Sequence, residues 1–183
     1  YLKSINLEVN ALASGATSHD VKAVKSLGAN YTNYPVSRSG LSPIQDFKTF
    51  VALRNIFKKQ QPDVILAYTI KPIIWGAIAA RAIPSCGFYA LVTGLGFAFQ
   101  QGGWKKNILM KLVIFLYKTA LIRADKVIFQ NPDNQQTFIN LGIVPACKTC
   151  VVNGSGVDIT HFYVKTLASS PTFLLIARLL GDK

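Results

Sequence analysis

Short apolar segments alternate with longer amphipathic ones along the whole sequence, and this alternation constrains the fold more than any other feature. It favours a parallel sheet, because parallel strands need long crossover connections, and helices usually supply them. We therefore predict an α/β fold with a Rossmann-like parallel sheet and helices on both faces. The predicted strands are residues 7–12, 31–36, 63–68, 88–92, 126–130 and 149–152, and the predicted helices are 18–27, 43–59, 72–82, 104–122 and 132–141.

Several of these helices carry recognisable start signals. Ser18 suits the N-cap of the first helix, and Ser42 with Gln45 has the spacing of a capping box before the second. Pro43 fits the first helical position. The second helix presents a predicted apolar face of Ile44, Phe47, Val51 and Phe57, whereas the helix over 72–82 is rich in small residues and is predicted to lie close on the sheet.

The two ends of the sequence look like parts of a larger fold. Residues 173–177 predict a buried strand, and residues 163–171 are mostly small and polar, as in a linker. We expect residues 1–162 to form an N-terminal domain that is incomplete at its start. Residues 172–183 would then begin a second domain, so that the chain is an internal piece of a longer protein.

Basic residues dominate the charge. Lysine and arginine number 20 against 8 acids, which gives a formal net charge of +12. Such a charge attracts phosphate-bearing partners, namely nucleotides, nucleic acid or anionic lipid. Nucleic acid is not expected, because no basic stripe is interleaved with stacking aromatics. No apolar run reaches the roughly 20 residues that span a bilayer.

The helix over 104–122 leaves two interpretations open. Its lysines surround the apolar residues Ile108, Leu112, Phe115 and Leu116. A basic amphipathic helix can lie on an anionic membrane surface. The more common arrangement in α/β domains buries the apolar face against the sheet, and this is our prediction.

Cysteine and histidine give no sign of a metal site or a catalytic triad. Cys147 and Cys150 form a CxxC pair, but tetrahedral zinc needs two further ligands, and Cys86, His19 and His161 are distant in sequence. We predict reduced thiols, as in a cytosolic protein.

Candidate binding residues follow the predicted strands, where open α/β sheets bind ligands. Glycines there allow backbone N–H groups to approach a phosphate or sugar. Lys71, beside the start of a helix, is either an anion-binding residue or a solvated loop lysine. The candidates are Thr69, Lys71, Thr93, Gly94, Gly96, Gly154, Ser155, Gly156, Asp158, Arg178 and Lys183, while Asn131 is explained equally well as a helix cap.

Five segments together resemble the N-terminal half of a retaining GT-B glycosyltransferase of family 4. They are SRSGLSPIQDFKTFVALRNIFKKQQPDVILAYTIKP, TGLGFAF, VIFQNPDNQQTFI, VVNGSGVDITHF and FLLIARLLGDK. The set is similar to bacterial enzymes that extend polyprenyl-diphosphate-linked sugars or build surface polysaccharide. The resemblance implies two Rossmann-like domains, of which this chain holds the acceptor side without its first strand.

The resemblance also implies a function. The whole protein would transfer a hexose or N-acetylhexosamine from a UDP-sugar to a lipid-linked or polysaccharide acceptor, without a metal or cofactor. Arg178 and Lys183 occupy the positions that neutralise the donor diphosphate, and Arg38 joins Thr69, Lys71, Thr93, Gly94 and Gly96 on the cleft side. The chain alone would be inactive, since most of the donor domain is missing.

Two alternatives remain from the sequence. One is a non-catalytic membrane-surface binding or assembly module that reuses the fold. The other is a GT-B UDP-sugar epimerase, which would need acid/base side chains in the cleft, where the sequence offers few acids. For the transferase we expect a cytoplasmic protein, peripheral on the inner face of the plasma membrane, with anionic lipid as a partner.

Overall fold

The computed structural model describes residues 6–37, 40, 42–96, 99, 103–154, 156–164, 170, 171 and 173. Within them strands and helices alternate as predicted. The elements are β1 (Asn10–Ala13), α1 (Ser18–Ser26), β2 (Asn30–Asn33), α2 (Pro43–Gln60), β3 (Val64–Tyr68), α3 (Ile70–Ala80), β4 (Gly87–Val92), α4 (Trp104–Leu121), β5 (Lys126–Phe129), α5 (Pro132–Asn140), the 3₁₀ turn η3 (Ala146–Lys148) and β6 (Thr149–Val151).

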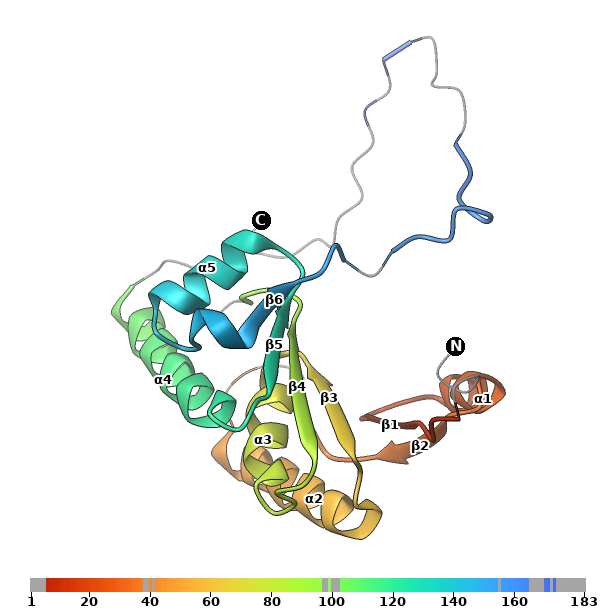
Figure 1. Cartoon of the computed structure of the whole chain (residues 1–183), viewed down its shortest axis with the longest axis horizontal. Helices are drawn as coiled ribbons and strands as arrows, with labels where there is room; N and C mark the ends of the chain where they lie inside the picture. The colour runs from red at the N-terminus through yellow and green to blue at the C-terminus, as the bar shows by residue number, and fades with distance from the viewer. Residues whose placement is uncertain are drawn as a thin grey trace.

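The strands form two parallel sheets. One is the pair β1-β2, and the other has the order β3-β4-β5-β6. Every pairing in both sheets is parallel. In Figure 1 the pair β1-β2 and α1 lie beyond β3, on the opposite side from α4 and α5. The predicted α/β class with a Rossmann-like parallel sheet is confirmed.

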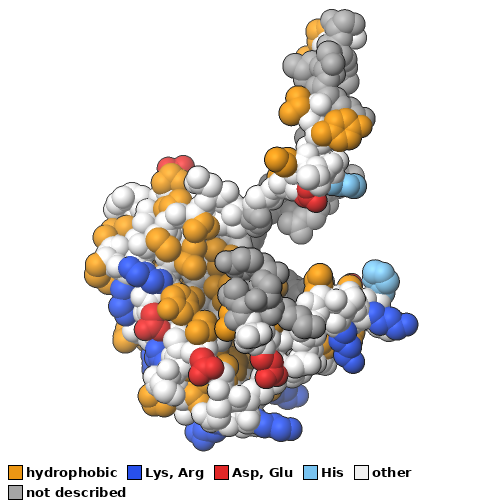
Figure 2. All heavy atoms as spheres, turned by 45° about the vertical axis from the view of Figure 1, so that its right-hand side comes forward, with side chains coloured by type: hydrophobic (Ala, Val, Ile, Leu, Met, Phe, Trp, Pro, Cys, Tyr) orange, Lys and Arg blue, Asp and Glu red, His pale blue; other side chains and the backbone are white. Residues whose placement is uncertain are grey.

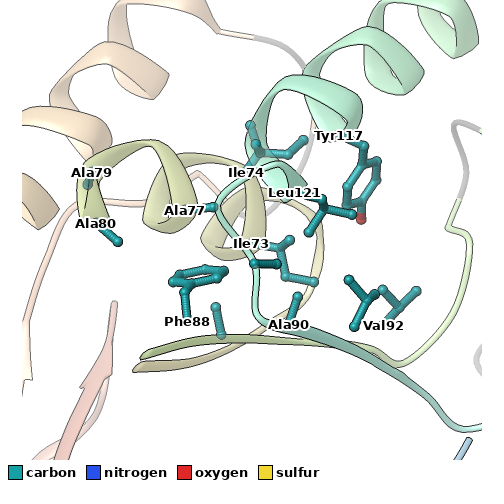
Figure 3. Packing of buried hydrophobic residues seen from close by; sticks show 14 of the residues in the cluster. Ile73, Ile74, Ala77, Ala79, Ala80, Phe88, Ala90, Val92, Tyr117 and Leu121 are labelled. Atoms are coloured by element: carbon teal, nitrogen blue, oxygen red, sulfur yellow. The ribbon is translucent and has the colours of Figure 1, made fainter. Parts of the chain in front are cut away.

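The core lies between the four-stranded sheet and the helices α3, α4 and α5. Ile73 and Ala77 of α3 are fully buried above Phe88 of β4, and Leu121 and Tyr117 of α4 belong to the same core cluster (Figure 3). A Cβ added to Gly76 would lie 3.5 Å from the Phe88 ring. The small residues therefore bring α3 close to the sheet, as predicted.

Aromatic contacts extend this core to α5. Phe138 is fully buried, with its ring centroid 5.1 Å from that of Tyr117 and 5.2 Å from that of Phe129 on β5. Val92 of β4 is the register partner of Phe129, and paired residues of a parallel sheet point to the same side. It follows that α3, α4 and α5 cover the same face of the sheet.

The other side of β3 is open. Val64, Leu66 and Tyr68 alternate with the core-facing residues and are 61%, 58% and 56% exposed. Hydrophobic side chains gather on the surface that Figure 2 turns toward the viewer. Parallel sheets are usually covered on both faces, so this exposure is unusual.

Two predicted apolar faces were wrong. On α4, Ile108, Leu112 and Phe115 point to solvent, while Val113, Tyr117 and Leu121 face the core. Of the predicted face, Leu116 is partly buried and packs against the core. The helix is apolar around most of its circumference, so periodicity did not select the buried side. On α2, Ile44, Phe47 and Val51 are likewise exposed, and only Phe57 of the predicted face is buried, together with Leu53.

Two predicted caps also differ. The N-cap of α1 is Thr17 rather than Ser18, in a capping box with Asp20. The hydrogen bonds from Thr17 to the Asp20 carboxylate lower the pKa of Asp20. At α2, Ser42 is the N-cap and Pro43 begins the helix, but the Ser42 side chain makes no cap hydrogen bond. Instead the Ser42 N–H donates to Asp46 at 3.4 Å, one residue beyond the predicted Gln45.

The chain after β6 forms no further strand or helix within the described residues. Residues 156–164 are exposed and lead away from the sheet in Figure 1. The predicted strand over 173–177 and most of the predicted linker fall outside the described residues. Among the helices that are described, none combines the length and the apolar character needed to cross a bilayer.

Candidate functional site

The predicted ligand-binding edge is formed by the loops that follow β3, β4, β5 and β6. Since these four strands are parallel and adjacent, their carboxyl ends meet at one edge of the sheet. Thr69 follows β3, Thr93 follows β4, and Gly154 lies beyond β6. The predicted residues therefore lie at one edge of the sheet, and the geometry of each loop decides what it can bind.

Thr69 has a strained backbone at the junction of β3 and α3. Its φ of 67° and ψ of 158° fall in a region that is almost restricted to glycine. Such a conformation costs about 1–3 kcal/mol and persists only where the surroundings hold it. The Thr69 carbonyl accepts a hydrogen bond of 3.1 Å from the Ile73 N–H, which fixes the start of α3. Strain of this kind is concentrated at binding and catalytic sites.

Lys71 is neither solvated nor free. Its Nζ lies 2.7 Å from Oδ1 of Asp46, and the two side chains are 15% and 5% exposed. The pair joins the first turn of α2 to the first turn of α3. Because Asp46 already balances its charge, Lys71 contributes no net positive charge to a bound anion while the pair is intact.

Gly96 links the loop after β4 to the start of α3. Its φ is +70°, and a Cβ there would lie 2.9 Å from Cδ1 of Ile70. A side chain would therefore clash with α3 as well as strain the backbone. Gly94 has nothing within 4 Å of its Cβ position, and Thr93 is exposed. The structure thus brings this glycine loop beside Thr69 and Lys71.

The loop after β6 is open and locally ordered. Gly154 and Gly156 have φ of +69° and +75°, with no atom within 4 Å of their Cβ positions. Oδ1 of Asp158 accepts hydrogen bonds from the Thr160 N–H at 2.9 Å and the Thr160 hydroxyl at 2.6 Å. These hydrogen bonds lower the pKa of Asp158. Asp158 therefore stabilises a turn, in contrast to a general acid that must hold a proton near neutral pH.

Asn131 caps α5 as the alternative interpretation predicted. Its side chain accepts a hydrogen bond of 2.9 Å from the Asn134 N–H. The remaining predicted site residues, Arg38, Ser155, Arg178 and Lys183, lie outside the described residues, so their places in the site are predictions from sequence.

A shallow cavity of about 240 Å³ lies elsewhere. Its lining includes Lys118, Leu121 and Ile143, at the carboxyl end of α4. Since α4 runs from the loop after β4 to the start of β5, this end belongs to the amino edge of the sheet. The cavity is therefore separate from the predicted ligand edge.

Asp46 and Thr49 were missed by the sequence analysis. Thr49 is fully buried, and its hydroxyl oxygen lies 2.7 Å from the Pro35 carbonyl oxygen, which ties α2 to the segment after β2. Both are polar residues on the buried side of α2. The only signal was their placement three residues apart, on one helix face, and it was masked by the more hydrophobic residues on the outer face.

The cysteines are free thiols. Cys86 is buried, and Cys147 and Cys150 are exposed. Desolvation raises the pKa of the Cys86 thiol, although the nearby Arg123 opposes this shift. In the part of the chain that the structure describes, no three metal-ligating side chains are grouped together.

The parallel α/β arrangement and the loops at its carboxyl edge define a Rossmann-like domain that resembles the N-terminal domain of GT-B glycosyltransferases. Residues 1–131 match the family described as Glycosyl transferase 4-like, and the chain belongs to this family.

A relative of known activity agrees with this assignment. The chain is 29% identical over 174 residues to the N,N'-diacetylbacillosaminyl-diphospho-undecaprenol alpha-1,3-N-acetylgalactosaminyltransferase of Campylobacter jejuni. The match covers 87% of this chain and 46% of the relative, so the chain spans about half of that protein.

A solved structure shows the likeness in fold. MurG of Acinetobacter baumannii superposes with a TM-score of 0.51 at 15% identity, over 86% of this chain and 39% of MurG. A complex of S. aureus MnaA with UDP gives a TM-score of 0.45 at 14% identity, over 79% of this chain and 43% of that chain.

Proposed function

We propose that the whole protein transfers a hexose or N-acetylhexosamine from a UDP-sugar to a lipid-linked or polysaccharide acceptor, with retention of the anomeric configuration. The observation that carries the proposal is family membership across residues 1–131, together with the match to a transferase that acts on an undecaprenol-linked sugar. On this proposal the described edge receives the acceptor. The donor is bound mainly by a second domain, which begins near residue 172.

Arg178 and Lys183 are proposed to act on the donor diphosphate. Two fixed cations stabilise the negative charge that develops on the leaving diphosphate in the transition state. No metal is then needed for that task. The Lys71–Asp46 pair supports this division of labour, because its charge is already neutralised and the unpaired cations must come from elsewhere.

The direct test uses the full-length protein with a UDP-sugar and a lipid-diphosphate-linked sugar acceptor. Removal of one charge-stabilising donor typically lowers turnover by about 10²–10³-fold. We expect Arg178→Ala to show a loss of this size with an unchanged circular dichroism spectrum. Lys22→Ala, on the exposed side of α1, removes one positive charge away from the site; it is the control and should retain activity. Undiminished turnover by Arg178→Ala would defeat the assignment.

We also propose that residues 1–162 form a domain completed by one further strand. Within the described residues, β1 pairs only with β2 and β3 pairs only with β4. A parallel strand that precedes β1 in sequence and lies between β1 and β3 would give the order β2-β1-new-β3-β4-β5-β6. This is the order of doubly wound folds, in which the first strand of the chain lies near the centre of the sheet. It would also give β3 a second neighbour.

Hydrogen exchange can test the additional strand. Alternate N–H groups of a parallel strand point to opposite neighbours. In the full-length protein, we expect the N–H groups of β3 that point away from β4 to be protected as strongly as those of β4. Fast exchange at these groups would contradict the additional strand without affecting the transferase proposal.

The exposed face of α4 supports membrane binding, which is the property that defines the second candidate, a membrane-surface module without catalysis. The two candidates differ in turnover: a module binds vesicles but transfers no sugar. The epimerase alternative gains no support from Asp158, whose carboxylate is occupied by the Thr160 hydrogen bonds.

A further inference from the structure

The outer face of α4 carries an exposed apolar stripe. Its residues are spaced three, four or seven positions apart and therefore lie along one side of the helix. This side is opposite Val113, Tyr117 and Leu121, which face the core. The exposed members are Trp104 (69%), Ile108 (58%), Leu112 (41%), Phe115 (65%) and Ile122 (74%).

Lysines border the stripe. Lys111 lies three residues after Ile108 and four before Phe115, and Lys118 lies three after Phe115 and four before Ile122. These spacings place each lysine next to the stripe on the helix surface. Both are exposed, and α4 contains no acidic residue. The face is therefore apolar along its centre and positively charged at its border.

The helix α2 repeats this arrangement on the other flank of α3. Ile44 and Phe47 are 73% and 64% exposed, and Lys48 and Arg54 lie near them on the exposed side. The acid of α2's first turn, Asp46, is buried against Lys71. Both helices in contact with α3 therefore present apolar and basic side chains to solvent, and Asp46 is the one acid in the sequences of the three helices.

We propose that the outer face of α4 docks on the surface of an anionic membrane, with Trp104, Ile108, Leu112 and Phe115 in the headgroup layer. An apolar stripe next to lysines is the arrangement by which a helix lies in the membrane interface. The lysines complement acidic lipid headgroups, each contributing about a fivefold gain in binding. A protein partner would need an acidic border of its own, whereas anionic lipid supplies that charge everywhere.

The orientation of α4 connects this surface with the proposed function, although the inference does not depend on catalysis. Trp104 begins the helix directly after the loop from β4, at the carboxyl edge of the sheet. The apolar stripe therefore starts beside the edge that would receive the acceptor. A membrane-anchored acceptor would then have only a short distance to cover.

The test is co-sedimentation of the full-length protein with vesicles of phosphatidylglycerol and phosphatidylcholine, compared with phosphatidylcholine alone. We expect binding that requires phosphatidylglycerol. Ile108→Gln with Phe115→Gln should weaken it about tenfold or more, because two apolar anchors are lost. Lys111→Glu with Lys118→Glu should weaken it by at least roughly 25-fold at low salt, the product of two fivefold losses.

Lys22→Glu with Lys25→Glu on α1 is the matched control, since it changes the net charge equally on two exposed lysines away from α4. It should leave binding within about twofold. An equal loss in this control would show attraction by net charge alone and overturn the proposal. Unchanged vesicle binding by the α4 variants would also overturn the proposal. So would substitutions that change the oligomeric state of the protein but not its vesicle binding.

A second measurement separates docking from catalysis. Transfer to a water-soluble, short-chain acceptor analogue should be unaffected by the α4 substitutions, whereas transfer to acceptor in vesicles should fall. If turnover on the soluble analogue is absent in the wild type but vesicle binding follows the expected pattern, the transferase proposal fails and the docking proposal stands.

Discussion

The neighbouring helices α3 and α4 lie on the same face of the sheet and contact each other, yet they use their residues in opposite ways. In α3, six residues are buried, and its one charged side chain, Lys71, is paired with Asp46. In α4, four large apolar side chains and the lysines Lys111 and Lys118 are exposed, and the apolar stripe continues to Ile122 at the C-cap. The comparison teaches that the 20 lysine and arginine residues are not equally available for binding, because Asp46 neutralises Lys71 in the interior.

The largest expected effect is on the free energy of unfolding, where substitution of Lys71 on α3 should differ from substitution of Lys111 on α4. Lys71→Met leaves the Asp46 carboxylate buried without its partner, which typically costs about 3–5 kcal/mol. Lys111→Met on α4 should change the free energy of unfolding by less than about 0.5 kcal/mol. Urea denaturation followed by circular dichroism measures both.

The double variant Lys71→Met with Asp46→Leu is the control for that result. Replacing a buried ion pair by apolar residues is often neutral, so most of the lost stability should return. Equal instability of the single and double variants would show that Lys71 acts through packing rather than through its charge.

The next largest effect is the difference in stability between a substitution on the buried face of α3 and one on the exposed face of α4. Ala77 of α3 is fully buried, so Ala77→Leu should destabilise the fold by about 1–3 kcal/mol through overpacking. Ile108→Gln on α4 should stay within about 0.5 kcal/mol, since that side chain is exposed. Thermal unfolding measures both variants. A lower melting temperature for Ile108→Gln than for Ala77→Leu would contradict this expectation.

The smallest effect tests how closely α3 lies on the sheet. A Cβ at Gly76 would make ordinary contact with Phe88 at 3.5 Å, and alanine is the better helix former. Gly76→Ala should therefore stabilise the protein by up to about 1 kcal/mol. Gly142→Ala, where φ is +60°, is the opposing control and should lose about 1–2 kcal/mol. A destabilised Gly76→Ala would mean that α3 lies closer to Phe88 than the 3.5 Å contact indicates.

The sequence predicted the order of the elements well, because each strand and helix has its own apolar period and end signals. Strands from Val64 onward begin and end within a residue of their predicted limits, whereas β1 begins three residues later than predicted. The apolar segment around Leu7 extends beyond the part that pairs with β2. Pairing depends on a neighbour, and local composition does not contain that information.

The site was predicted less completely for the same reason. The edge that holds Thr69, Thr93 and Gly96 follows from strand order alone. The partner of Lys71 does not, because Asp46 is 25 residues away in sequence and meets it only when α2 packs on α3. The exposed side of α4 was mistaken for its buried side, since both sides are apolar and only the tertiary packing distinguishes them.

The position of β3 at the edge of its sheet has a practical consequence. An edge strand offers a row of unsatisfied amide and carbonyl groups on which another polypeptide can add as a strand. Here that row is flanked by Val64, Leu66 and Tyr68, all more than half exposed, which makes such addition more favourable. We expect these 183 residues on their own to self-associate through β3, and the additional strand proposed above would suppress this by covering the edge.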